Sequence, residues 1–260
     1  ARFKEMDYFS QSTLNYKVNK IELMNPTIGS GRHSEMRLIL FLWIGFDLSL
    51  SVIRIGYSRR LTFVFLIWNL FLALMPYALA RLAHWWQVEG HAHWKVVLAA
   101  AASLLFLPNA PYLLTDLFHL TWAGESAPLW LDTLLLLSYA MTGLLLFYRS
   151  LFLLLQLGGA YGKARWIHLA AVGLVYLTSF GMYLGRYLRF NSWDILSDPW
   201  SLAAAVLERF WLPNAHPRTW GVTLGYGTLL LIGYIGICSC NRYWQRHYDV
   251  QQTATIRPPE

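Results

Sequence analysis

Residues 95–120 read KVVLAAAASLLFLPNAPYLLTDLFHL, a run that is long and apolar enough to cross a lipid bilayer as a helix. Five further apolar runs lie at about residues 36–55, 61–83, 128–150, 165–188 and 218–240. An open sheet cannot cross lipid, because the amides at its edges would have no partners. The six runs therefore predict an all-α protein, a polytopic membrane bundle of six transmembrane helices.

The composition of the chain agrees with a membrane environment. Of its 260 residues, 56% are hydrophobic and only 13% are charged, about half the charged fraction that is usual in soluble domains. The net charge is +7, but the Lys and Arg residues lie between the apolar runs, as they do in membrane loops. We therefore expect the lipid bilayer as a partner and no nucleic acid.

The distribution of positive charge predicts the orientation of the bundle. Six crossings place both termini on one side, which carries 14 of the Lys and Arg residues, whereas the other side carries 7. By the positive-inside rule both termini are cytoplasmic, although Arg59 and Arg60 fall on the opposite side. The predicted parts are a polar N-terminal cytoplasmic segment (1–35), a transmembrane domain (36–240) and a cytoplasmic tail (241–260).

The longest loop, residues 191–217, contains a sequence typical of a short helix. Asp198 can cap a helix that begins with Pro199 in its first turn. Trp200, Leu207 and Trp211 then give that helix an apolar side. We predict a short interfacial helix near 199–211 that lies on the outer surface of the membrane.

The third run is expected to be a broken helix. Pro108 should push Leu107 away from α geometry, and Pro111 removes another backbone donor. The helix should therefore break at Pro108–Pro111. Asn109 is placed to cap a second half-helix that runs to about His119.

Polar residues recur at helical spacing on this half-helix and at the same depth of other spans. Asn109, Tyr112, Asp116 and His119 are 3, 4 and 3 residues apart, which places them on one face. Alternation of the spans brings seven polar residues toward one side, namely Arg54, Asn69, Asp116, His119, Asp132, Arg186 and Arg189.

Ionisable groups inside a membrane are costly and are candidates for function. We infer one polar pocket in the outer half of the bundle, although ion pairs that only staple helices together would give the same pattern. The candidate ligand-binding residues are Asn69, Asn109, Tyr112, Asp116, His119, Asp132, Tyr183, Arg186, Arg189, Asn191 and Asp194.

Four stretches resemble a known family. They are WNL (68–70) through PY (76–77), FLPNAPYLLTDLFH (106–119), PLWLD (128–132) and GRYLRFNSWD (185–194), and together they span residues 68–195. The chain is similar here to domain-of-unknown-function family 1361, multi-pass membrane proteins of bacteria, including cyanobacteria. The resemblance implies a six-helix fold in the bacterial inner (plasma) or thylakoid membrane. It implies no activity.

The polar residues support a first functional hypothesis, in which the outward-facing pocket binds or processes a small polar, anionic or lipid-headgroup ligand. Arg186 and Arg189 would hold a phosphate or carboxylate. Asp116, His119 and Asp132 could instead hold a divalent metal, because carboxylate oxygens and imidazole are accepted ligands. No catalytic residue is assigned, and whether the protein is an enzyme is left open.

In a second hypothesis the chain is a non-catalytic accessory subunit of a larger photosynthetic or respiratory membrane complex, in contact with pigments or lipids. A third, a haem or pigment protein, is less favoured. A haem held by two histidines needs both at one depth, whereas His119 and His168 lie near opposite ends of their spans.

Overall fold

The computed structural model describes residues 30–124, 126–159 and 164–256. The chain divides into two compact units, residues 1–47 and 48–260. Of the first unit only the beginning of helix α2 (Ser30–Ser58) is described. Most of the predicted N-terminal segment 1–35 therefore lies outside the described residues. The second unit contains all the other described elements.

The described part of the second unit is helical and contains no strand. Besides the end of α2 it contains α3 (Phe65–Val88), α4 (His93–Phe106), α5 (Asn109–Tyr112), η1 (Leu113–Trp122), α6 (Leu129–Gly159), α7 (Ala164–Leu188), α8 (Asp194–Ser197), α9 (Pro199–Trp211), η2 (Pro213–Ala215) and α10 (Pro217–Ile256). Within the described residues, six helical stretches are long and apolar enough to cross a membrane. The predicted fold class is confirmed, and the chain is a multi-pass membrane protein.

The third span, α4 to η1, differs from the predicted broken helix in its details. Leu107 and Pro108 both keep right-handed helical dihedral angles, so the prediction that Leu107 leaves α geometry is wrong. A proline ring fits helical φ but cannot donate a hydrogen bond. The chain therefore changes to tighter bonds from residue i+3 to residue i, as between Ala110 N and the Leu107 carbonyl at 3.3 Å.

The second half of this span is η1, a 3-10 helix of 10 residues, rather than an α-helix. Residues three apart eclipse one another in a 3-10 helix, so Asp116 and His119 still share a face. The predicted capping role of Asn109 is wrong. Pro108 holds the cap position of α5 without a side-chain bond, and the Asn109 side-chain amide donates to the Phe106 carbonyl at the end of α4, at 3.1 Å.

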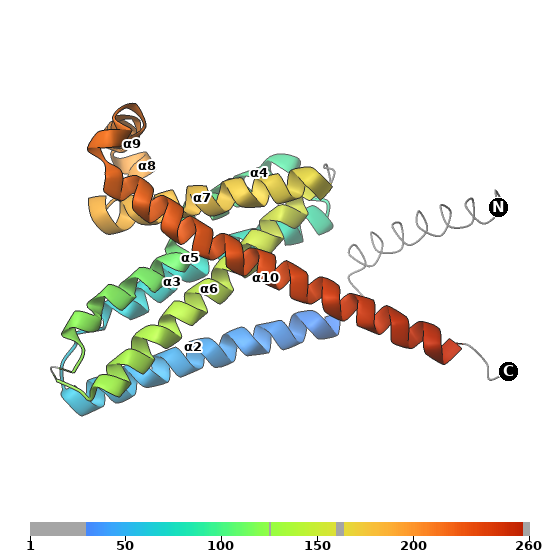
Figure 1. Cartoon of the computed structure of the whole chain (residues 1–260), viewed down its shortest axis with the longest axis horizontal. Coiled ribbons are helices and arrows are strands. Elements are labelled where there is room, and N and C mark those ends of the chain that lie inside the picture. Colours follow the sequence, from blue (N-terminus) through green and yellow to red (C-terminus); the bar gives the residue numbers. More distant parts are fainter. Residues whose placement is uncertain (1–29, 125, 160–163, 257–260) are drawn as a thin grey trace. The chain divides into compact units, whose positions relative to one another are not determined.

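Two glycines let the middle of the third span pack closely between α6 and α7. A Cβ atom at Gly143 of α6 would collide with the backbone of Ala110 and lie 2.9 Å from Leu113 Cβ. One at Gly181 of α7 would collide with the Pro108 ring. Even the methyl group of alanine would therefore be too large at either position. Figure 1 shows α3, α5 and α6 side by side, and contacts join all three pairs of these helices.

The predicted loop helix is present as α9, with the predicted bounds and cap. The Asp198 carboxylate accepts a hydrogen bond from Ser201 N at 3.2 Å, and Pro199 is the first helical residue. In Figure 1, α8 and α9 lie where α7 ends and α10 begins. Trp200 and Trp211 are each 84% exposed. The interfacial position of α9 stays a prediction. Helix α10 continues beyond residue 240, where the cytoplasmic tail was expected to begin.

Candidate functional site

A buried carboxylate on η1 joins three spans. Asp116 accepts a hydrogen bond from the Asn69 side-chain amide of α3 at 2.9 Å and pairs with Arg186 Nη1 of α7 at 3.1 Å. The Asp116 side chain is 1% exposed, whereas that of Arg186 is 15% exposed. The Tyr112 hydroxyl lies 3.5 Å from Arg186 Nη1. We call these residues, with His119, the Arg186 network.

His119 contacts the same guanidinium. Its Nε2 lies 3.2 Å from Arg186 Nη2. A guanidinium can only donate, so His119 Nε2 is the acceptor and the ring proton is assigned to Nδ1. The ring is held between Phe65, at 4.9 Å between centroids, and Trp122, at 4.3 Å. The network therefore holds the imidazole neutral beside a partly exposed cation.

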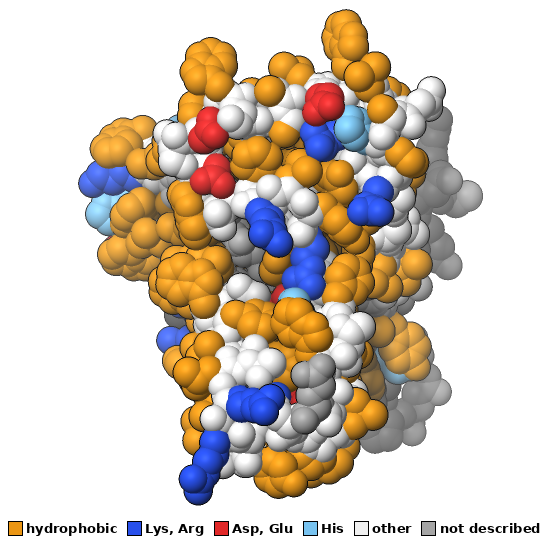
Figure 2. Space-filling model, turned by 90° about the vertical axis from the view of Figure 1, so that its left-hand side faces the viewer, with side chains coloured by type: hydrophobic (Ala, Val, Ile, Leu, Met, Phe, Trp, Pro, Cys, Tyr) orange, Lys and Arg blue, Asp and Glu red, His pale blue; other side chains and the backbone are white. Residues whose placement is uncertain are grey.

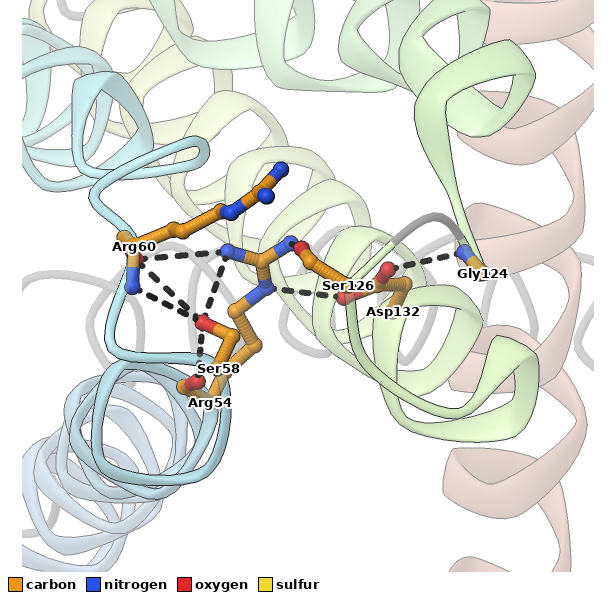
Figure 3. A network of polar contacts seen from close by, with 6 residues as sticks. All are labelled: Arg54, Ser58, Arg60, Gly124, Ser126 and Asp132. Atoms are coloured by element: carbon orange, nitrogen blue, oxygen red, sulfur yellow. Dashed lines mark hydrogen bonds and ion pairs between the residues drawn. The ribbon is translucent and has the colours of Figure 1, made fainter.

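A second buried ion pair forms a separate network (Figure 3). Arg54 Nε of α2 lies 3.0 Å from Asp132 Oδ1 of α6, and these side chains are 1% and 0% exposed. The other Asp132 oxygen accepts from Gly124 N at 3.1 Å. We call this group the Arg54 network. It joins the end of α2 to the loop between η1 and α6.

The two arginines differ in how completely they are bonded. Arg54 also donates to Ser126 Oγ at 3.0 Å, to Ser58 Oγ at 3.3 Å and to the Arg60 carbonyl at 3.4 Å. It is fully buried in these contacts. Arg186 retains an exposed surface. The Arg54 side chain is therefore enclosed by the protein, whereas the Arg186 side chain is not.

Aromatic side chains connect the two networks. The Arg54 guanidinium lies 4.7 Å from the centroid of the Phe63 ring. Phe63 contacts Phe65 at 6.2 Å, and Phe65 contacts His119. The sequence predicted one meeting place for the polar residues of several spans. In the structure these residues instead form two networks. Asp132 pairs with Arg54, and Asp116 pairs with Arg186.

The remaining candidate residues have other neighbours. Asn109 donates to Ser192 Oγ at 2.8 Å, and the buried ring of Tyr183 stacks on Tyr187. Arg189 is exposed and has φ 61° at the end of α7. The backbone N–H of Asn191 donates to Asp194 Oδ2 at 2.6 Å, and this bond lowers the pKa of Asp194 below its ordinary value.

The metal hypothesis finds its three residues divided between networks. Asp116 and His119 both contact Arg186, and Asp132 is bonded to Arg54. In the part of the chain that the structure describes, no three His, Cys, Asp or Glu residues are grouped so that they could hold a metal ion. A metal site would require the two guanidiniums to move away, and it stays a hypothesis.

Sequence reasoning missed several partners in these networks. Ser58, Ser126 and Ser192 are small polar residues at helix ends or in loops, and Gly124 contributes only its backbone. Phe63 and Phe65 cannot be told apart from lipid-facing residues by their type. Arg54 and Asp132 were both recognised as polar residues on this side, but their pairing was not predicted.

Positive charge gathers around the ends of the helices on this side. Arg59 and Arg60 follow α2, Arg189 follows α7, and Arg218 lies at the start of α10 over the Tyr187 ring, at 5.7 Å. All four arginines are exposed. Figure 2 shows basic side chains spread down one face between hydrophobic ones.

The sequence matches a family model over most of its length. The family described as "Protein of unknown function (DUF1361)" matches residues 68–232. The chain belongs to this family. The match includes the whole Arg186 network and Asp132, but Arg54 lies outside it. No curated protein and no solved structure matches the chain.

Proposed function

We propose that this DUF1361 protein binds an anionic ligand, carrying a phosphate or carboxylate group, at Arg186 in the outer half of the bundle. The observation that carries the proposal is a guanidinium that contacts Asp116, His119 and Tyr112, on a side chain that is still partly exposed. Nη1 is bonded to Asp116 and Nη2 to His119, and the N–H groups that these contacts do not use could donate to an oxyanion.

The surroundings favour an anion over a cation. The Arg186 charge is already balanced by Asp116, but Arg189 and Arg218 are exposed near the same ends of α7 and α10. A second negative charge would therefore meet a net positive field. The headgroup of an anionic phospholipid fits this place, since it would lie at the end of the spans. Free phosphate has the same chemistry.

A comparison with the Arg54 network supports a binding role. Both arginines pair with a carboxylate that is at most 1% exposed. If the pairs only held helices together, both could be buried to the same degree. The Arg54 side chain is 1% exposed, whereas the Arg186 side chain is 15% exposed. The exposed part of Arg186 is what a ligand requires.

The test measures thermal unfolding of the detergent-purified chain with and without added phosphatidylglycerol, phosphatidylcholine or inorganic phosphate. We expect phosphatidylglycerol to raise Tm by several degrees, because a ligand that binds only the folded state stabilises it. Phosphatidylcholine, which has no net charge, should have little effect. A response to inorganic phosphate that equals the response to phosphatidylglycerol would identify the free anion as the ligand.

The decisive variant is Asp116→Asn/Arg186→Gln, which removes the pair without leaving a buried charge unpaired. The matched control is Asp132→Asn/Arg54→Gln. We expect both double variants to have a lower Tm, but only the first to lose its response to the anion. An equal response in the wild type and the first variant would contradict the proposal.

A further inference from the structure

The surface of α3 carries a groove that is lined by apolar side chains. Val64, just before the helix, and Ile67, Trp68 and Phe71 line this groove, and its volume is about 440 Å³. All four side chains are exposed. The Trp68 and Phe71 rings stack on each other, with 5.4 Å between their centroids. The groove therefore lies on a face of α3 that the rest of the described chain leaves uncovered.

The groove lies at the beginning of a membrane span. Helix α3 begins at Phe65 and is long and apolar enough to cross a membrane. From Val64 to Phe71 a helix rises by about 10 Å, at 1.5 Å per residue. The groove therefore runs from the end of the span toward the middle of the bilayer, which is the direction that an acyl chain takes from its headgroup. Hydrocarbon is the medium that suits such an apolar lining.

A row of partly exposed side chains connects the groove with Arg186. Phe65 follows Val64 in the sequence, and its ring lies 4.9 Å from the His119 ring, measured between centroids. His119 Nε2 in turn lies 3.2 Å from Arg186 Nη2. Phe65, His119 and Arg186 are neither fully buried nor fully exposed. The connection therefore runs along the surface of the bundle.

Asn69 provides a second link between the groove and the Arg186 network. Trp68, its neighbour in the sequence, lines the groove, and the Asn69 side-chain amide donates to Asp116 at 2.9 Å. Asp116 is paired with Arg186. The part of α3 that carries the groove is thus attached to the network by a side-chain hydrogen bond as well as by a ring contact. The groove and the guanidinium therefore keep a fixed relation, as two parts of one site must.

We propose that the groove holds an acyl chain of an anionic phospholipid whose phosphate is bound at Arg186. This inference rests on the proposed function, and it names the ligand as a lipid rather than a free anion. The phosphate accepts hydrogen bonds from the guanidinium, and the chain lies along Trp68 and Phe71. Lipid tails around the bundle are as apolar as the groove, so the selection of this lipid comes from the charge at Arg186.

Brominated lipids test which chain lies in the groove, because bromine quenches the fluorescence of a tryptophan that it contacts. The full chain is reconstituted in phosphatidylcholine vesicles that contain equal amounts of either brominated phosphatidylglycerol or brominated phosphatidylcholine. The difference between the wild type and Trp68→Phe gives the Trp68 signal. We expect phosphatidylglycerol to be preferred at Trp68 by about tenfold, since a hydrogen bond to a charged group contributes at least that factor.

Trp130 is the matched control. It is the second residue of α6 and is 67% exposed, but it does not line the groove. The difference between the wild type and Trp130→Phe gives its signal, and there we expect the two brominated lipids to quench equally. In the Asp116→Asn/Arg186→Gln background, the preference for phosphatidylglycerol at Trp68 should also be lost.

The outcomes separate this inference from the proposed function. If phosphatidylglycerol raises Tm through Arg186 but the two brominated lipids quench Trp68 equally, the chain lies elsewhere and only the groove proposal is overturned. The same holds if inorganic phosphate raises Tm as much as phosphatidylglycerol does, because the ligand is then a free anion. A preference at Trp68 that persists without Arg186 also overturns the groove proposal. If no anion raises Tm, both proposals fail.

Discussion

The guanidinium of Arg186 lies 3.1 Å from the carboxylate of Asp116, and it is partly exposed while the carboxylate is not. The carboxylate is fixed from its other side by Asn69 of α3. Three spans thus hold one cation at the edge of the bundle. The buried Asp116 carboxylate thus positions the Arg186 guanidinium, and the Arg186 side chain stays partly exposed.

The Arg54–Asp132 pair should contribute strongly to stability. Arg54→Gln leaves the Asp132 carboxylate buried beside Gly124 alone, and we expect a loss of about 3–5 kcal/mol in the free energy of unfolding. Chemical unfolding in detergent measures this loss. Arg59→Gln, which makes the same change at an exposed arginine, is the control. A loss below about 1 kcal/mol for Arg54→Gln would mean that the pair is solvated.

The close packing of the third span should make Gly143 intolerant of a side chain. Gly143→Ala forces the new Cβ into the backbone of Ala110, at an expected cost of about 1–3 kcal/mol. Gly221 in α10 has no atom within 4 Å of the equivalent position. Gly221→Ala should therefore be neutral or stabilising by up to about 1 kcal/mol, because alanine favours helix. Similar Tm values for the two variants would refute the close contact.

The predicted orientation can be tested by chemical labelling. In a Cys238→Ala/Cys240→Ala background, Ser197→Cys places a single thiol on α8, which we expect outside the cytoplasm. A membrane-impermeant maleimide should label it in intact cells, whereas a tag at the C-terminus should become accessible only after lysis. The opposite pattern would show an inverted topology, with the Arg186 network on the cytoplasmic side.

The Asp194 carboxylate should titrate below its ordinary range. The backbone N–H of Asn191 stabilises its charged form, so its folded-state pKa is lowered. The stability that this contact provides is present above the unfolded-state pKa and is lost as pH falls through the folded-state pKa. NMR titration of the labelled carboxyl measures the value. An ordinary pKa would show that the bond to Asn191 does not persist.

Much of the fold could be predicted from the sequence. Apolar runs of about 20 residues give the six spans, and Asp198-Pro199 gives the start of α9, because these signals are local. The meeting of Asp116, His119 and Arg186 followed from their spacing and from the alternation of the spans. That alternation fixes the depth of a residue but not its neighbours in the bundle.

The partners of each polar residue could not be predicted. Whether Asp132 meets Arg54 or Arg186 depends on which helices are adjacent, and the sequence pattern does not determine that. The missing donors of Pro108 and Pro111 can be seen in the sequence, but the 3-10 bonds that replace them cannot. The hypothesis of an accessory subunit concerns other chains and stays a prediction.

Native mass spectrometry of the protein released from membranes tests the central claim most directly, because it counts the anionic lipids or phosphate groups that remain bound. We predict that the wild type and Asp132→Asn/Arg54→Gln retain such a ligand and that Asp116→Asn/Arg186→Gln loses it. Equal retention by all three proteins, or no retained anionic ligand on the wild type, would contradict a binding role for Arg186.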